Sequence, residues 1–347
     1  MTSRRDFLQS TAGVAAIAAT LPGVALAQSG SQAAPKFTAR IAHLEAPTQP
    51  RHQGLEKVAA LVKDRTKGDV ELKLYPAAQL GNARQQIEGV QFGAIECTVM
   101  PAAFLGGFNP VISALDIPYI FPTDRAVSQK LRDGEFGRAL LASFDTRGMV
   151  GLALWPNGRK SLTSNKPLGN LDQLKGQKFR VMDSKILIDQ FAAVGATAIA
   201  INFSELYTSL QTGLIDGQEN PLDTITTMKF HEVQKYLVVT EHGALEDVVL
   251  FNPGWWKALP AEHRAAIAKA FEEVRPEVEK IKEAAQVASL DIVKAAKVDV
   301  RIADEAERAR LRDATVPRAR SAYLERAGAE GRKVLEIFDA ERTKLGF

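Results

Sequence analysis

The chain has 347 residues, of which 46% are hydrophobic and 24% charged. That length suffices for two domains with their own cores, and the composition excludes an intrinsically disordered chain. Lys and Arg number 44 against 41 Asp and Glu, and no basic tract stands out, so no nucleic-acid partner is expected. The single cysteine, Cys97, excludes a disulfide framework, an iron–sulfur cluster and a thiolate zinc site, and no metal or cofactor is expected.

The first 27 residues have the order of an export signal. The twin-arginine pattern at 3–8 is followed by an apolar run from Ala12 to about Leu21 and by the small-x-small site at 25–27. The run is too short for a membrane span, and no cysteine marks a lipid anchor at the cleavage site. We therefore expect residues 1–27 to be removed on export to the periplasm, by the Tat or the Sec route, ahead of a linker at 28–36.

Strand and helix patterns alternate through the rest of the chain. Alternating apolar residues predict strands, and apolar residues three and four apart predict helices. Strands are expected at 37–41, 70–74, 95–100, 150–155, 178–182, 198–202, 236–241 and 247–251. Helices are expected at 52–66, 82–92, 186–194, 204–211, 260–296 with a kink at Pro276, and 304–327. Such βαβ order predicts mostly parallel sheets flanked by helices.

The βαβ pattern occurs twice, and this repetition predicts two lobes. The two blocks are joined near 155–157, and the chain crosses back near Glu241. Lobes joined by more than one segment form a hinge, with a ligand site in the cleft between them. We expect lobe I to comprise 37–156 and about 242–285, and lobe II to comprise 157–241 and about 286–347 with the C-terminal helices.

The sequence contains no common catalytic motif. There is no nucleophile elbow, H-E-x-x-H zinc motif, phosphate-binding P-loop or G-x-G-x-x-G run. No two of the five histidines have the i,i+4 spacing of a metal pair on a helix. We therefore expect a protein that is not an enzyme.

Two segments place polar residues where a ligand could be held. Arg180 lies between Phe179 and Val181 in an expected strand. Its planar guanidinium can bind a carboxylate through two hydrogen bonds, and a solvent-exposed surface residue is the alternative. The glycine-rich run 213–221 predicts a turn, in which Asn220 offers one acceptor and two donors to a ligand or only fixes the turn.

Several longer segments together resemble one family, the DctP-type solute-binding proteins of TRAP (tripartite ATP-independent periplasmic) transporters. They occur in the family's order, from about Phe37 to the C-terminal helices. The segments are Leu74–Gly81, Leu174–Gly176 with Arg180-Val181, Phe203–Tyr207, Leu210–Pro221 and Lys229–Tyr236. The resemblance implies an α/β clamshell fold of the periplasmic-binding-protein type, with two lobes, each a mostly parallel sheet flanked by helices, and long C-terminal helices.

The resemblance also implies which residues bind the ligand. Arg180 matches the family's carboxylate-binding arginine, and Asn220 matches a contact to the same ligand. The other positions that match pocket residues are Phe203, Met182, Asp183, His43, Met100 and Pro101. Many members carry a second arginine where this chain has Lys160, beside Arg159. Adjacent strand residues face opposite ways, so we expect one of these two in the cleft, with Lys160 slightly favoured, although lysine lacks the bidentate fork.

The function that the resemblance implies is that of a periplasmic receptor. It would bind a small organic acid by hinge closure and deliver it to the membrane subunits of a TRAP transporter. C4-dicarboxylates, sugar acids and keto acids all fit one arginine in a polar pocket. A ligand-sensing subunit of a membrane kinase is one alternative, and a Tat-exported enzyme is another. The chain is expected to be a monomer or a homodimer.

Overall fold

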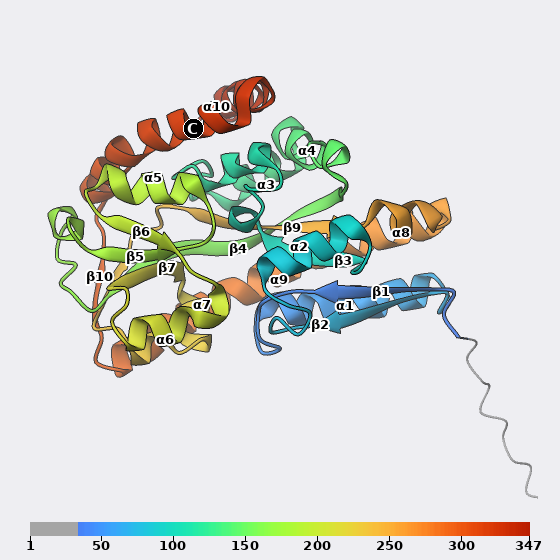
Figure 1. Ribbon diagram of the computed structural model, residues 1–347, viewed down its shortest axis with the longest axis horizontal. Helices are drawn as coiled ribbons and strands as arrows, with labels where there is room; N and C mark the ends of the chain where they lie inside the picture. Colours follow the sequence, from blue (N-terminus) through green and yellow to red (C-terminus); the bar gives the residue numbers. More distant parts are fainter. Residues whose placement is uncertain (1–33) are drawn as a thin grey trace, which may run out of the picture. The chain divides into compact units, whose positions relative to one another are not determined.

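The computed structural model describes residues 34–347, so the export signal predicted at 1–27 lies outside the described residues (Figure 1). The strands are β1 (Phe37–Ala42), β2 (Val70–Tyr75), β3 (Cys97–Pro101), β4 (Val150–Ser164), β5 (Lys178–Val181), β6 (Thr197–Ala200), β7 (Gly217–Pro221), β8 (Tyr236–Val239), β9 (Ala244–Phe251) and β10 (Asp299–Ile302). The α-helices are α1 (Pro50–Arg65), α2 (Ala83–Phe92), α3 (Arg125–Asp133), α4 (Glu135–Ala142), α5 (Lys185–Ala193), α6 (Leu206–Gln211), α7 (Leu222–Thr227), α8 (Pro253–Ala258), α9 (Ala261–Ala295) and α10 (Glu305–Leu345). Three short 3₁₀ helices bear on the site: η1 (Ala102–Phe104), η2 (Pro110–Asp116) and η5 (Phe203–Glu205).

Strand β4 is long enough to take part in two sheets. Its first part, up to Arg159, pairs antiparallel with β9 and completes the order β2-β1-β3-β9-β4, which we call the lobe I sheet. Its last part, from Lys160, pairs antiparallel with β7 and β8, and β7, β5 and β6 follow as parallel neighbours in the lobe II sheet. Strand β10 pairs with β8 at the edge. The expected α/β fold is confirmed, and the antiparallel pairs make both sheets mixed.

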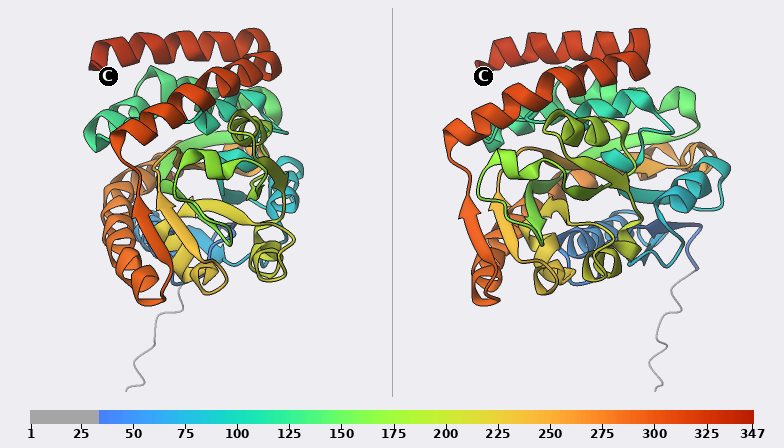
Figure 2. Two further views of the ribbon diagram at one scale, coloured as in Figure 1. Left: turned by 90° about the vertical axis from the view of Figure 1, so that its left-hand side faces the viewer. Right: turned by 60° about the vertical axis from the view of Figure 1, so that its left-hand side comes forward.

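Helices cover the lobe I sheet on both faces. On one face α1 and α9 pack against the strands around a core that includes Val58, Trp155 and Phe271. A larger core on the other face joins η1, η2 and α4 to α5 and α10. Helix α10 packs against α5 as well as against α4 and η2, and it forms two legs that lie side by side (Figure 2). Helix α10 contacts elements next to both sheets, so its contacts do not assign it to one lobe. The predicted lobe boundaries therefore stay a prediction.

The turn expected at 213–221 is confined to its first residues, and 217–221 form the buried strand β7. The run Gly-Gln-Glu-Asn-Pro has no apolar pattern, but β7 lies between β4 and β5, and its polar side chains are buried together with polar partners. Gly217 allows this close approach, because a Cβ there would lie 2.1 Å from the carbonyl oxygen of Thr163. Tertiary pairing therefore overrides the local turn signal.

Other elements extend beyond the expected ranges or were not expected. Strand β4 continues from the expected end at 155 to Ser164, while α3, α4, α7, α8 and β10 have no counterpart in the sequence pattern. Helix α9 continues through Pro276. The helix expected to end at 327 is interrupted by Gly328, whose φ of 58° and ψ of −142° are non-helical, and the second leg of α10 follows. A positive φ favours glycine at this break.

Candidate functional site

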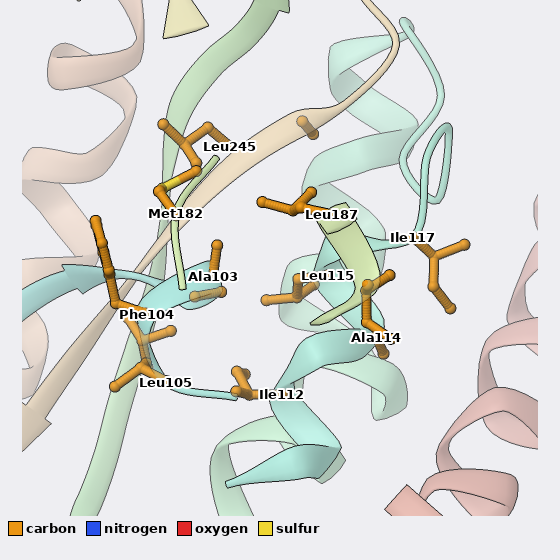
Figure 3. Close-up of a cluster of buried hydrophobic side chains, with 14 of the residues drawn as sticks. Ala103, Phe104, Leu105, Ile112, Ala114, Leu115, Ile117, Met182, Leu187 and Leu245 are labelled. Carbon is orange, nitrogen blue, oxygen red and sulfur yellow. The ribbon is translucent and has the colours of Figure 1, made fainter. Parts of the chain in front are cut away.

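A cavity of about 20 Å³ lies between elements of the two lobes. Its wall comprises Leu44, Glu45, Arg51, Pro101 and Phe104 from lobe I, Met182, Phe203, Asn220 and Thr224 from lobe II, and Asn157 and Leu245 from β4 and β9. Figure 3 shows three apolar members of this wall, Phe104, Met182 and Leu245, which come from three separate elements. Such a volume holds about one water molecule, so an organic acid enters only when the walls move apart. Relative motion of the two lobes would provide that opening.

Arg180 is fully buried on β5 of lobe II, next to Phe203 of the cavity wall. Its Nε donates a hydrogen bond to the carbonyl oxygen of Ile201 at 2.9 Å, and its guanidinium lies 5.9 Å from the ring centroid of Phe203. Among the described residues, its Nη2 has no hydrogen-bond partner and no carboxylate lies within 4 Å of the guanidinium. Burial lowers the pKa of Arg180 to about 10. A buried cation with a spare donor favours an anionic partner, and a carboxylate fits it.

Four predicted site residues line the cavity: Asn220, Phe203, Met182 and Pro101. Arg180 is not one of the lining residues. Asn220 is held in β7 opposite Ser161 of β4, and its side-chain nitrogen donates to the side-chain oxygen of Gln218. Phe203 in η5 packs edge-to-face on Phe230, with ring centroids 6.1 Å apart. The structure therefore brings these four residues together on one wall, and their contact with a ligand stays a prediction.

Lys160 and Arg159 face opposite sides of β4, as adjacent strand residues do, but neither lines the cavity. The ammonium of Lys160 donates to Glu219 Oε1 at 2.6 Å, and both side chains are buried. His242 lies 2.8 Å from the second oxygen of Glu219. Burial opposes ionisation of Glu219, but the charge of Lys160 and the hydrogen bond with His242 outweigh it and lower its pKa to about 2. Arg159 donates to the carbonyl oxygens of Phe121 at 3.3 Å and of Pro122.

The remaining three predicted residues also lie outside the cavity wall. His43 is fully buried, with its Nε2 3.0 Å from Nδ1 of His52. Met100 packs in the apolar core, and Asp183 is exposed at the end of β5. Met100 directly precedes Pro101, and Asp183 directly follows Met182, and both of these neighbours reach the wall. Adjacent residues of an extended chain face opposite sides, so Met100 and Asp183 point away from the cavity. Their predicted ligand contacts find no support in the geometry.

Four polar residues of the wall were missed by the sequence analysis: Arg51, Glu45, Asn157 and Thr224. Arg51 donates two parallel hydrogen bonds to Asp247, both at 2.6 Å, and lies 3.1 Å from Glu45. Asn157 donates to Asp247 at 2.9 Å and to Glu45 at 3.2 Å. Arg51, Glu45 and Asn157 each have one side-chain atom without a hydrogen-bond partner within residues 34–347: Arg51 Nη1, Glu45 Oε2 and Asn157 Oδ1. The wall therefore offers a ligand one further donor and two acceptors.

A signal for two of these residues exists in the sequence. Glu45 and Arg51 follow β1 in the same βα connection as His43, where ligand contacts are common. That pattern indicates the connection but does not tell which of its side chains faces the cavity. Asn157 lies at the predicted junction of the lobes, but only the pairing of β4 with β9 orients it.

The part of the chain from Ala34 onward holds neither a candidate metal cluster nor a candidate membrane span. No group of three or more His, Cys, Asp or Glu is placed to hold a metal ion there. None of the helices in that part is both long enough and apolar enough to cross a membrane.

Two lobes joined by β4 and by the β8–β9 connection, with a cavity lined by apolar and polar side chains between them, are the arrangement of a solute-binding protein of the clamshell type. The model of bacterial extracellular solute-binding protein family 7, DctP, matches residues 41–326. The chain belongs to this family, and the fold and the periplasmic location implied by the resemblance are thereby confirmed.

Similar proteins include solved structures with different ligands. A TRAP periplasmic solute-binding protein of Desulfovibrio salexigens with bound orotic acid is 58% identical, with a TM-score of 0.88 over 89% of this chain and 99% of that one. One from Shewanella oneidensis with bound succinate is 31% identical, with a TM-score of 0.81 over 89% and 99% of the two chains. The C4-dicarboxylate-binding periplasmic protein DctP of Rhodobacter capsulatus is 36% identical over 273 residues, 78% of this chain and 79% of its own.

The buried His43 predicts a stability that falls in mild acid. Burial, together with the charge of Arg51, lowers the pKa of His43 to about 3. The unfolded chain binds a proton at the ordinary histidine pKa of about 6.5, so below that pH protonation favours unfolding. We expect the free energy of unfolding to drop more between about pH 7 and pH 5 in the wild type than in His43→Gln, as measured by urea denaturation.

Two carboxyl groups have the opposite effect on the free energy of unfolding over part of this pH range. Burial raises the pKa of Asp116 and of Asp247 to about 6. Each binds a proton more readily in the folded chain, so each adds stability as the pH falls below about 6. Both are present in the wild type and in the His43 variant, and the comparison removes most of their contribution. Equal losses in the two proteins would contradict the role given to His43.

Proposed function

We propose that this protein is the ligand-binding receptor of a TRAP transporter, that it binds a small organic acid through Arg180, and that it hands the acid to the membrane subunits. The observation that carries the proposal is the spare donor of a fully buried guanidinium with no carboxylate beside it among the described residues. A ligand carboxylate would satisfy that donor and neutralise the charge. The work of the protein is binding, with no chemical step.

The pairing of Arg180 with a ligand carboxylate also explains why binding would close the lobes. Arg180 and Asn220 lie on lobe II, whereas Glu45 and Arg51 lie on lobe I. A ligand that spans the cavity contacts both sets only when the lobes are together. Because a ligand shifts an equilibrium by its differential affinity for the two states, contacts made only in the closed state drive closure.

Four unpartnered atoms narrow the class of acid, three of them on wall residues and one on Arg180 next to the wall residue Phe203. Arg180 Nη2 and Arg51 Nη1 are donors, whereas Glu45 Oε2 and Asn157 Oδ1 are acceptors. An acid that also carries N–H or O–H donors satisfies all four atoms. A plain dicarboxylate leaves the two acceptors unpaired and places a negative charge near Glu45, which is costly in a buried site.

Orotic acid, the ligand of the Desulfovibrio salexigens relative, has the required chemistry. It carries one carboxylate together with ring N–H donors and carbonyl acceptors. We therefore propose a cyclic or hydroxylated monocarboxylate as the ligand class, with orotate as the first compound to test. Succinate, the ligand of the Shewanella oneidensis relative, has no donors and is the natural comparison.

The test is calorimetric titration and thermal unfolding of the protein with orotate, succinate and galacturonate. Orotate is expected to bind and to raise the unfolding temperature, with succinate at least about tenfold weaker. Glu45→Gln should narrow that difference, whereas Glu262→Gln, an exposed acid on α9, should leave it unchanged. Binding of none of these acids would contradict the assignment of the ligand class.

A further inference from the structure

A second pocket, of about 540 Å³, lies apart from the ligand cavity and shares no residue with it. It is formed by the segment 117–123, by Arg159 of β4, by Glu241 between β8 and β9, and by both legs of α10. Figure 2 shows the two legs of α10 running beside each other. A volume of this size lies within the range of about 300–1,000 Å³ that is typical of small-molecule sites.

The charged side chains of this pocket are mainly basic. Five arginines line it: Arg159, Arg308, Arg312, Arg320 and Arg342. Only two acids, Glu241 and Glu305, line it with them. Glu241 pairs with Arg308 at 2.7 Å, and Glu305 lies 3.8 Å from Arg312. Asp339, outside the lining, pairs with Arg320.

Within the described part of the chain, one of the five guanidinium groups has no acidic partner. Arg159 has no carboxylate side chain within 4 Å and donates to the carbonyl oxygens of Phe121 and Pro122. Arg342 donates through its Nε to a main-chain oxygen of the carboxyl-terminal residue Phe347 at 2.7 Å. The pocket therefore keeps an excess of positive charge that an anion would offset.

The rest of the lining is apolar and aromatic. Tyr119, Phe121, Val316 and Phe338 all contribute to it. The guanidinium of Arg312 lies 5.7 Å from the ring centroid of Tyr119. Apolar walls with a few placed cations favour a ligand that has an apolar body and a negative head.

The pocket is also attached to two of the connections between the lobes, β4 and the segment between β8 and β9. Arg159 lies where the register between β4 and β9 shifts, and Glu241 lies between β8 and β9 with a positive φ of 51°. Tyr119 has a φ of 57°, and its N–H donates to the carbonyl oxygen of His242 at 3.0 Å. Strained backbone of this kind is costly and concentrates at functional segments.

We propose that this pocket is a second binding site, one that takes an organic anion with an apolar or aromatic body and is coupled to lobe closure through Arg159 and Glu241. Closure changes the backbone of the segments that carry these two residues. An anion in the pocket therefore has different affinities for the open and closed forms, and by linkage it changes the affinity of the cleft for its own ligand.

The probe for the test is 1-anilinonaphthalene-8-sulfonate, an aromatic anion that fluoresces when it leaves water. Titration into the folded wild type is expected to saturate at one site per chain. Arg312→Glu should weaken this binding by about tenfold or more, because it reverses a charge at the pocket. Arg310→Glu makes the same change on an exposed position of α10 about 200° around the helix, and should alter binding by about twofold at most.

Three outcomes would overturn the proposal. The first is a probe signal that does not saturate, and the second is equal weakening of probe binding in the Arg312 and Arg310 variants. The third is loss of probe binding in Arg180→Met, which would place the probe in the cleft. Thermal unfolding of each variant without probe checks that the chain is folded. Coupling to lobe closure is tested separately by titrating the wild type with orotate in the presence of saturating probe. We expect the probe to change the affinity for orotate, and an unchanged affinity would contradict the link to closure.

Discussion

Replacing Arg180 by methionine should lower the affinity for the carboxylate ligand by about 100-fold or more. The ligand-free variant should be at least as stable as the wild type, because Met removes a buried charge that has no carboxylate partner among the described residues. Calorimetric titration with orotate measures the first effect, and thermal unfolding without ligand measures the second. A variant that is stable but does not bind separates loss of the site from loss of the fold.

Lys178 provides the matched control for this experiment. It is a basic residue of the same strand, and it is exposed. Lys178→Met should leave both ligand affinity and stability close to those of the wild type. Binding of wild-type strength in Arg180→Met, with the ligand that binds the wild type, would remove Arg180 from the site and with it the proposed mechanism.

Replacing Lys160 by methionine should lower the free energy of unfolding by about 3–5 kcal/mol. The variant leaves the carboxylate of Glu219 buried without the cation that lies 2.6 Å from it. The double variant Lys160→Met with Glu219→Gln removes both charges and should regain most of the loss. Urea denaturation of the wild type, both single variants and the double variant gives the interaction energy of the pair.

The same variants examine the ligand contact that the family resemblance implies for Lys160. If Lys160 only balances Glu219, the double variant binds orotate with nearly wild-type affinity. If Lys160 touches the ligand, the double variant binds more weakly although its stability is restored. A loss of less than about 1 kcal/mol in Lys160→Met would contradict the structural role that its geometry indicates.

Much of the fold follows from local sequence patterns. Strands β1 and β2 and helices α1 and α2 have regular apolar spacing, and the structure places them within a few residues of the expected ranges. Strand β7 could not be predicted in this way, because its polar residues are buried through pairing with β4 and β5 rather than through apolar side chains. Pairing between distant segments leaves little trace in a local pattern.

The site was predictable to a different extent at each residue. Arg180 stood out because a guanidinium within an apolar strand needs an explanation, and Asn220 because it follows two glycines in a distinctive run. Arg51 and Asn157 did not stand out in this way, since both are held by Asp247, which lies 90 residues or more from them in sequence. Lys160 was predicted to bind the ligand from its sequence position, but that position gave no indication that Glu219 already neutralises its charge.

A crystal structure of the protein with orotate tests the central claim most directly. We expect the carboxylate to lie between the lobes, within about 3.2 Å of Arg180 Nη2, with the ring donors toward Glu45 and Asn157. An acid bound elsewhere on the protein, or one in the cleft whose carboxylate does not contact Arg180, would contradict it.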